Sequence, residues 1–158
     1  MHPNVERVAA ALAAGGVTSP DLRELNDTTR TAEQAAAALG VPVGAIVKSL
    51  VFAADGEPVM VLASGDHQVD TSIVAETLGA EHVGRADADA VRAATGFAIG
   101  GVPPVAHVTQ MRTIVDRHLA TYDVIWAAAG TPHAVFATTF DDLVQLSGGT
   151  AADVGTPA

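Results

Sequence analysis

The sequence predicts a single α+β domain, and three observations carry that prediction. Segments with helical spacing of apolar residues are mixed with a β-hairpin and further β-rich runs, without the strict strand-helix alternation of a parallel α/β fold. A chain of 158 residues with 49% hydrophobic residues is long enough to bury one core. No internal repeat and no linker divides it, so we expect one domain over residues 1–158.

Helix signals open the chain. Val5 to Ala14 carries apolar residues at helical spacing and stops at Gly15-Gly16. Thr31-Ala32-Glu33-Gln34 fits a capping box, which starts a second helix over 32–39. Gly40 and Pro42 then end that helix.

A hairpin comes after the second helix. The β-rich runs 46–53 and 59–63 flank an Asp55-Gly56 turn, a pair typical of tight hairpin turns. Asp70 to Leu78, ended by Gly79, predicts the next helix.

Short elements are expected in the remaining chain. A strand is expected over 82–85 and a helix over 87–94, and the loop Gly100 to Pro104 comes next. Further strands are expected over 113–115, 124–128 and 134–137, and a last helix over 141–146 after a Thr139 cap. The tail from Gly148 is expected to be frayed.

Charge and composition exclude several function classes. The formal net charge of −10 disfavours broad contact with a nucleic-acid backbone, and the seven arginines are dispersed. The absence of cysteine excludes disulfides and thiolate chemistry. No run approaches the roughly 20 apolar residues of a membrane span, and the N-terminus lacks the pattern of a secretory signal. We therefore expect a cytoplasmic protein that contacts neither membrane nor DNA.

Lys48 is the only lysine, and it lies in the apolar strand 46–53. Strand alternation puts it on the same face as Ile46, Leu50 and Phe52. A lysine there either holds a phosphate or carboxylate in a cavity, or belongs to an edge strand and extends its ammonium into water. A Schiff-base nucleophile is a third, weaker interpretation.

The loop Ile99-Gly100-Gly101-Val102-Pro103-Pro104 is a second candidate site. Its glycines permit unusual dihedrals, whereas the two prolines stiffen its C-terminal end. The N–H groups of Gly100, Gly101 and Val102 are expected to form a donor cluster for a carbonyl oxygen or oxyanion. Taken alone, such a cluster is also consistent with a plain turn.

The six histidines show neither HxH nor HExxH spacing, so no metal site is predicted. His107, just after the loop, and His133 are candidates to line a shared cavity, and the polar loop Ser64-Gly65-Asp66-His67 is another candidate to reach a pocket. Structural or exposed roles remain open for all of them. No Walker A or Rossmann glycine pattern is present, and no cofactor is expected.

The order of these motifs resembles the YbaK/EbsC family, the family of the prolyl-tRNA-synthetase-associated editing domain. The similarity rests on the strand with Lys48, the Asp55-Gly56 hairpin, the helix ending at Leu78-Gly79-Ala80 and the Gly100 to Pro104 loop. It runs from about Thr28 to Leu146. Residues 1–27 would then add an N-terminal helix and strand, and residues 147–158 a tail. The resemblance implies a curved or barrel-like mixed sheet flanked by helices.

The resemblance also implies roles for individual residues. Lys48 would hold the phosphate backbone at the tRNA 3′ end. The family's Gly-x-x-x-Pro loop matches Gly100 to Pro104 and would bind the aminoacyl group around the scissile ester. His107 would tune substrate choice. The full set of expected site residues is Lys48, Gly100, Gly101 and Val102 for catalysis, with Pro103, Pro104, His107, Ser64, Asp66 and His133 as substrate contacts.

The expected activity is hydrolysis, in trans, of the ester of a mischarged tRNA, with tRNA(Pro) carrying Cys, Ala or another small residue as the substrate. The ester carbonyl is expected to rest against the N–H groups of Gly101 and Val102. Attack would come from a water, the ribose hydroxyl or the substrate's own side chain. Expected partners are the aminoacyl-tRNA 3′ end and prolyl-tRNA synthetase. The alternative is a non-catalytic nucleotide- or partner-binding module that retains the pocket.

Overall fold

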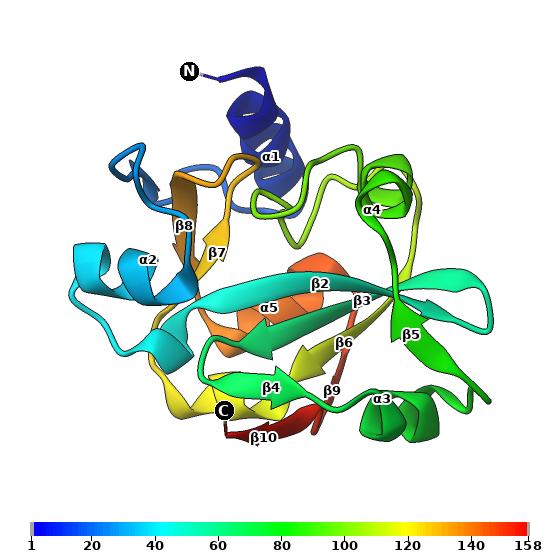
Figure 1. The fold of residues 1–158 in the computed structure, drawn as a ribbon. Helices are drawn as coiled ribbons and strands as arrows, with labels where there is room; N and C mark the ends of the chain where they lie inside the picture. The colour runs from blue at the N-terminus through cyan, green and yellow to red at the C-terminus, as the bar shows by residue number, and fades with distance from the viewer. Residues whose placement is uncertain (1, 158) are drawn as a thin grey trace.

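The computed structural model describes residues 2–157, and its largest sheet has five strands in the order β5-β2-β3-β6-β9 (Figure 1). The long hairpin β2 (Val47–Ala54) and β3 (Glu57–Ser64) pairs antiparallel from Val47↔Ser64 to Ala54↔Glu57. The strands β6 (Arg112–Asp116) and β9 (Thr150–Ala152) continue the sheet in parallel, and β5 (Val83–Arg85) pairs antiparallel with the far end of β2. The sheet is therefore mixed, as the family resemblance implies.

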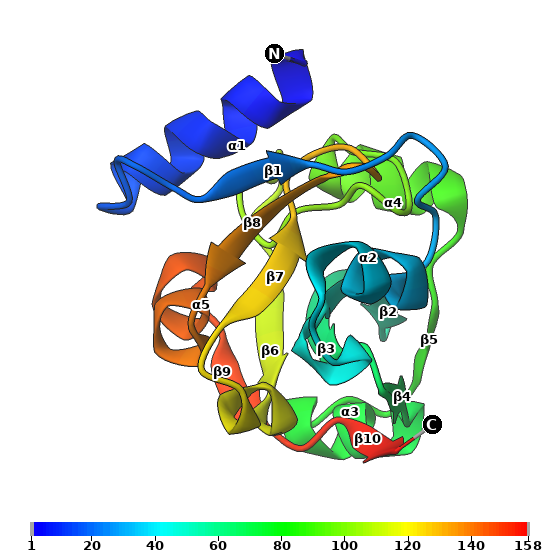
Figure 2. The ribbon, with the colours of Figure 1, turned by 90° about the vertical axis from the view of Figure 1, so that its left-hand side faces the viewer.

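A second sheet stands beside the first. It has the order β1-β8-β7, formed by β1 (Leu22–Glu24), β8 (Ala134–Thr138) and β7 (Ile125–Ala128). One parallel bridge, Ile46↔Trp126, joins the start of β2 to β7. The two sheets thus wrap around a common interior, which gives the curved arrangement visible in Figure 2.

Five α-helices cover these sheets in the described part of the chain. They are α1 (Pro3–Ala14), α2 (Ala32–Leu39), α3 (Thr71–Leu78), α4 (Ala88–Thr95) and α5 (Phe140–Ser147). Of two short 3-10 helices, η1 (Val43–Ala45) lies between α2 and β2, and η2 (Arg117–Thr121) lies between β6 and β7. Two capping signals act as predicted: Thr31 and Gln34 form the capping box of α2, and Thr139 caps α5. Asp70 and Asp87 also cap α3 and α4.

The core has separate parts on the two faces of the large sheet. Val47, Val51 and Met60 belong to a cluster that includes α1 and the β7-β8 hairpin, whereas Phe52 and Val61 pack under α3. Helix α1 contributes Val5, Val8 and Leu12 to the first cluster, and Figure 2 shows it lying across the outside of the small sheet. The N-terminal helix is therefore a packing element of the core.

The expectation of a frayed tail is wrong. Residues 150–152 form β9 against β6, and β10 (Gly155–Pro157) pairs antiparallel with β4 (His67–Val69). Val154 between them is fully buried. The tail is ordered because backbone pairing with β6 and β4 and the buried side chain of Val154 hold it in place. The composition of the tail indicates neither the pairing nor the burial.

Candidate functional site

The candidate site lies along an edge of β2 that is only partly paired. One edge of β2 pairs with β3 over the whole strand. On the other edge, β5 pairs only with Phe52–Ala54, and Ile46 bridges to Trp126. Between these contacts, residues 48–51 leave a gap in the pairing of the described strands, and two clefts open there.

We name the two clefts by their outer walls. The β5-side cleft has a volume of about 370 Å³ and is closed by Gln68, Thr71 and Arg85. The α2-side cleft has a volume of about 270 Å³ and is closed by Arg30, Ala32 and Trp126. The residues that line both are Lys48, Ser49, Leu50, Ile99 and Val102. The clefts therefore meet where β2 faces the glycine loop.

Lys48 stands at this junction. Its face of the strand is the predicted one, because Leu50 and Phe52 pack together in the core under α3. The side chain is partly buried, and Nζ donates a hydrogen bond of 2.7 Å to the carbonyl of His67. An ammonium has three donors, so two remain for a ligand in the clefts. This geometry favours the ligand-group interpretation over a lysine that extends into bulk water.

The glycine loop forms the opposite wall. Gly100 is exposed with a φ of +95°, a conformation that favours glycine, and lines the α2-side cleft. The N–H of Gly101 donates to the carbonyl of Ala98 at 3.1 Å, which closes a turn. The expectation that Gly101 N–H is free to hold an oxyanion therefore needs correction. Of the three expected donors, Gly100 and Val102 have N–H groups without a backbone partner in the described chain.

His107 is hydrogen-bonded to the glycine loop. Its Nε2 donates to the carbonyl of Pro103 at 2.6 Å, and burial lowers the pKa of the imidazole. Pro103 and Pro104 are buried and line neither of the two clefts. These three residues shape the loop in this structure and do not face the clefts, in contrast to the expected substrate contacts.

His133 lies on the far side of the same loop. Together with Gly101, His2 and Asn4 it lines a separate cavity of about 470 Å³. Its neighbour Pro132 reaches the α2-side cleft, and Arg30 Nη1 lies 3.4 Å from His133 Nε2. The predicted shared cavity of His107 and His133 is absent from the described cavities.

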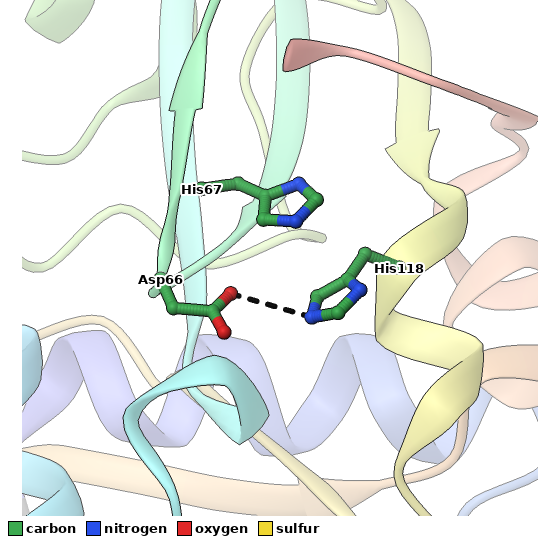
Figure 3. A group of neighbouring side chains, drawn as sticks. All are labelled: Asp66, His67 and His118. Atoms are coloured by element: carbon green, nitrogen blue, oxygen red, sulfur yellow. Dashed lines mark ion pairs between the residues drawn. The ribbon is translucent and has the colours of Figure 1, made fainter. Parts of the chain in front are cut away.

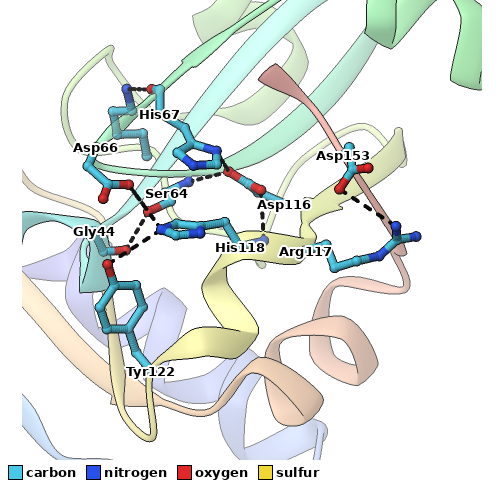
Figure 4. A network of polar contacts seen from close by, with 10 residues as sticks. Gly44, Ser64, Asp66, His67, Asp116, Arg117, His118, Tyr122 and Asp153 are labelled. Carbon is cyan, nitrogen blue, oxygen red and sulfur yellow. Dashed lines mark hydrogen bonds and ion pairs between the residues drawn. The ribbon is translucent and has the colours of Figure 1, made fainter. Parts of the chain in front are cut away.

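Ser64 and Asp66 lie outside both clefts, which corrects their expected role as cleft residues. Ser64 is fully buried, and its Oγ lies 2.6 Å from the Gly44 carbonyl and 2.8 Å from Asp66 Oδ1, two acceptors that share its one hydroxyl hydrogen. Burial opposes ionisation of Asp66, but the Ser64 hydrogen bond and the neighbouring His118 outweigh it and lower the pKa of the carboxyl. Figure 4 shows these residues in a polar network with His67, Asp116 and His118, and Figure 3 shows Asp66 beside the two histidines.

Several cleft residues were missed by the sequence analysis. Arg30 and Arg85 each bring a cation to one cleft, beside the shared Lys48. Ser49 Oγ is buried without a hydrogen-bond partner among the described residues, although Ser49 lines both clefts. A hydroxyl directly after the lone lysine in an apolar strand was the one local signal available for it.

The sequence that forms these clefts matches a known domain family. Residues 26–146 match the model of the aminoacyl-tRNA editing domain. The chain belongs to that family. The match covers the capping box of α2, the Lys48 strand, the glycine loop and α5.

Relatives of this editing domain occur alone and inside larger proteins. Proline–tRNA ligase of Nitratidesulfovibrio vulgaris (strain Hildenborough) is 35% identical over 120 residues, which are 73% of this chain but 21% of that ligase. The chain thus spans about a fifth of the ligases it matches. YwhH of Bacillus subtilis, an uncharacterised protein, is 29% identical over 128 residues and matched over 81% of its length.

The fold is the same in a solved structure. A protein proposed to be a trans-editing enzyme for prolyl tRNA synthetase superposes with a TM-score of 0.94 at 40% identity, with 99% of each chain covered. The editing domain described here therefore has the α+β fold of that protein, including the terminal elements outside residues 26–146. No helix among residues 2–157 is long and apolar enough to cross a membrane.

Proposed function

We propose that this editing domain is a trans-acting deacylase that hydrolyses the ester of mischarged tRNA, with tRNA(Pro) carrying Cys, Ala or another small residue as substrate. The observation that carries the proposal is the position of Lys48, at the junction of two clefts and opposite a glycine loop with free N–H groups. The similarity to a proposed trans-editing enzyme supports the same activity.

The two clefts suit the two parts of an aminoacylated adenosine. The α2-side cleft is the smaller, and side chains such as Ala32, Ala35 and Ala128 give it apolar walls that fit a small aminoacyl group. The β5-side cleft offers the polar groups of Gln68 and Thr71 and the cation of Arg85. We assign it to the terminal nucleotide. Lys48 would then lie between them and bind a phosphate oxygen.

Catalysis in this proposal comes from positioning and from oxyanion stabilisation. With the Gly101 N–H used in a turn, the donors for the developing oxyanion are the N–H groups of Gly100 and Val102. The two clefts have no histidine in their walls, so no Ser-His pair serves as nucleophile and base there. The attacking group is then a water, the ribose hydroxyl or the substrate's own side chain. Ser49 Oγ is placed to bond a substrate oxygen or amine.

Charge limits how the tRNA is bound. With a net charge of −10, the protein gains little from the bulk of the phosphate backbone, and its grip depends on Lys48, Arg30 and Arg85 at the clefts. We propose that prolyl-tRNA synthetase presents the tRNA in the cytoplasm. Affinity for bare tRNA should be weak and should fall with salt; tight, salt-insensitive binding would contradict this.

A deacylation panel tests the function. Wild type and Lys48→Ala are incubated with tRNA(Pro) charged with Ala, Cys, Ser or Pro, and the surviving ester is measured over time. We expect wild type to hydrolyse at least one mischarged species, and the variant to be inactive while its circular dichroism is unchanged. Hydrolysis of none, together with tight nucleotide binding, would favour the alternative of a binding module. Full activity in Lys48→Ala would remove the mechanism.

A further inference from the structure

A cluster of two histidines and an aspartate lies outside the linings of both clefts. Asp66 comes from the turn between β3 and β4, His67 is the first residue of β4, and His118 comes from η2 (Figure 3). Each residue offers one ligand atom, and these atoms all lie within 4.8 Å of one another. The expectation of no metal site considered only local spacing, whereas this cluster joins residues far apart in the sequence.

The distances approach those of a tetrahedral site. His118 Nε2 lies 3.4 Å from Asp66 Oδ1. Two ligands bound at about 2.0–2.1 Å to one tetrahedral Zn²⁺ are themselves about 3.3–3.4 Å apart. The imidazoles of His67 and His118 are stacked with centroids 4.1 Å apart, so a ring rotation is needed to direct both lone pairs at one ion.

A buried carboxylate supports the cluster. Asp116 is 1% exposed and accepts the backbone N–H of Ser64 through Oδ2 and that of His118 through Oδ1, both at 3.0 Å. The same Oδ2 lies 3.3 Å from His67 Nδ1, which is buried and makes no well-directed hydrogen bond within the described residues (Figure 4). A histidine that binds a metal through one ring nitrogen characteristically donates a hydrogen bond from the other ring nitrogen to such a carboxylate. Because Nδ1 of His67 faces Asp116, Nε2 is the ring nitrogen that remains available to bind an ion.

The negative charge of the cluster and its exposure to solvent also suit a bound cation. Asp66 and Asp116 bring two carboxylates to two imidazoles, so a divalent ion would offset their negative charge. The side chains of Asp66 and His118 are 37% and 30% exposed, which leaves a path for the ion and an open fourth position. Imidazole ligands favour ions of the zinc class over Mg²⁺ or Ca²⁺.

We propose that Asp66, His67 and His118 bind a Zn²⁺-class cation, with Asp116 orienting His67. The site is distinct from the clefts and does not depend on the proposed deacylase activity. Its consequence is structural: the carbonyl of His67 holds Lys48 Nζ, so an ion bound to the imidazole would fix the turn that positions the lysine.

The test uses metal-free protein without a histidine tag. Zn²⁺ is titrated by calorimetry, and Co²⁺ is added as a spectroscopic probe of four-coordinate geometry. We expect one equivalent to bind, with the affinity reduced by more than about 100-fold in His118→Ala and by about 10–100-fold in Asp116→Asn. His82→Ala, which removes an exposed histidine outside the cluster, should bind as wild type does.

Two results would overturn the site. One is the absence of Zn²⁺ binding at micromolar concentrations. The other is binding that His118→Ala and Asp66→Asn leave unchanged, which would indicate adventitious surface coordination. Asp66 is partly exposed, so Asp66→Asn should fold even if a histidine variant does not.

Discussion

Replacing Gly101 with alanine tests whether the conformation of the glycine loop determines the rate of deacylation. A Cβ at this position would lie 2.9 Å from Thr131 Cα, 3.0 Å from Thr131 C and 3.1 Å from Gly130 O. All three are backbone atoms and cannot rotate away. Ordinary carbon contacts begin near 3.5 Å, so the loop must move by about 0.6 Å.

Two effects of different size result from that shift. Overpacking of this kind costs about 1–3 kcal/mol of unfolding free energy. A displacement of about 1 Å at a catalytic group can cost about 100-fold in rate, so a shift of about 0.6 Å that moves the flanking N–H groups of Gly100 and Val102 should lower deacylation by about 10–100-fold. The assays are urea denaturation followed by circular dichroism, and single-turnover hydrolysis of mischarged tRNA.

Gly149→Ala is the matched control. Its Cβ would also meet an atom at 2.9 Å, but that atom is Val115 Cγ2, a side-chain atom remote from the clefts. We expect a comparable or smaller loss of stability and an unchanged rate. If Gly101→Ala retains the wild-type rate, or if Gly149→Ala loses as much activity while folded, the loop does not position the reaction as proposed.

Three further outcomes are expected. Ser49→Ala should raise the unfolding free energy by up to about 1–3 kcal/mol, since it removes a buried hydroxyl without a partner, and should slow deacylation; a loss of stability in urea denaturation would contradict this. Arg85→Met should raise KM and flatten its salt dependence with little change in kcat; an unchanged KM would remove Arg85 from the nucleotide cleft. Burial lowers the pKa of His107 in the folded state, so its neutral form favours folding above the unfolded pKa of about 6.5, and that contribution is lost as the pH falls through the folded pKa. Urea denaturation between pH 7.5 and pH 5 should therefore show a steeper loss of stability in wild type than in His107→Gln, and parallel curves would refute the assignment.

Local signals predicted much of the fold. The Thr31 to Gln34 capping box, the Asp55-Gly56 turn and the Thr139 cap each depend on a few neighbouring residues, and each forms in the structure as predicted. Strand alternation likewise placed Lys48 on the face of Leu50 and Phe52. These predictions succeed because the hydrogen bonds of a cap and the direction of a side chain on a strand depend on residues that are neighbours along the chain.

Predictions that depended on distant partners fared worse. Ser64 and Asp66 were expected in a loop that could reach a pocket, but Asp116 at the end of the neighbouring strand β6 and His118 in η2 hold the surrounding turn and its side chains. The tail was expected to be frayed because β6 and β4, its pairing partners, lie far away in sequence.

By itself, the sequence determined which residues are exceptional: one lysine in an apolar strand and one glycine-proline loop, in an order that identified the family. The tertiary structure alone decided where they meet, at the unpaired edge of β2 between two clefts. It also decided which N–H groups are free, since the Gly101 N–H is used in a turn, and it gathered Asp66, His67 and His118 into one cluster. The physical reason is that unpaired edges, free donors and ligand clusters depend on which distant segments occupy the neighbouring space.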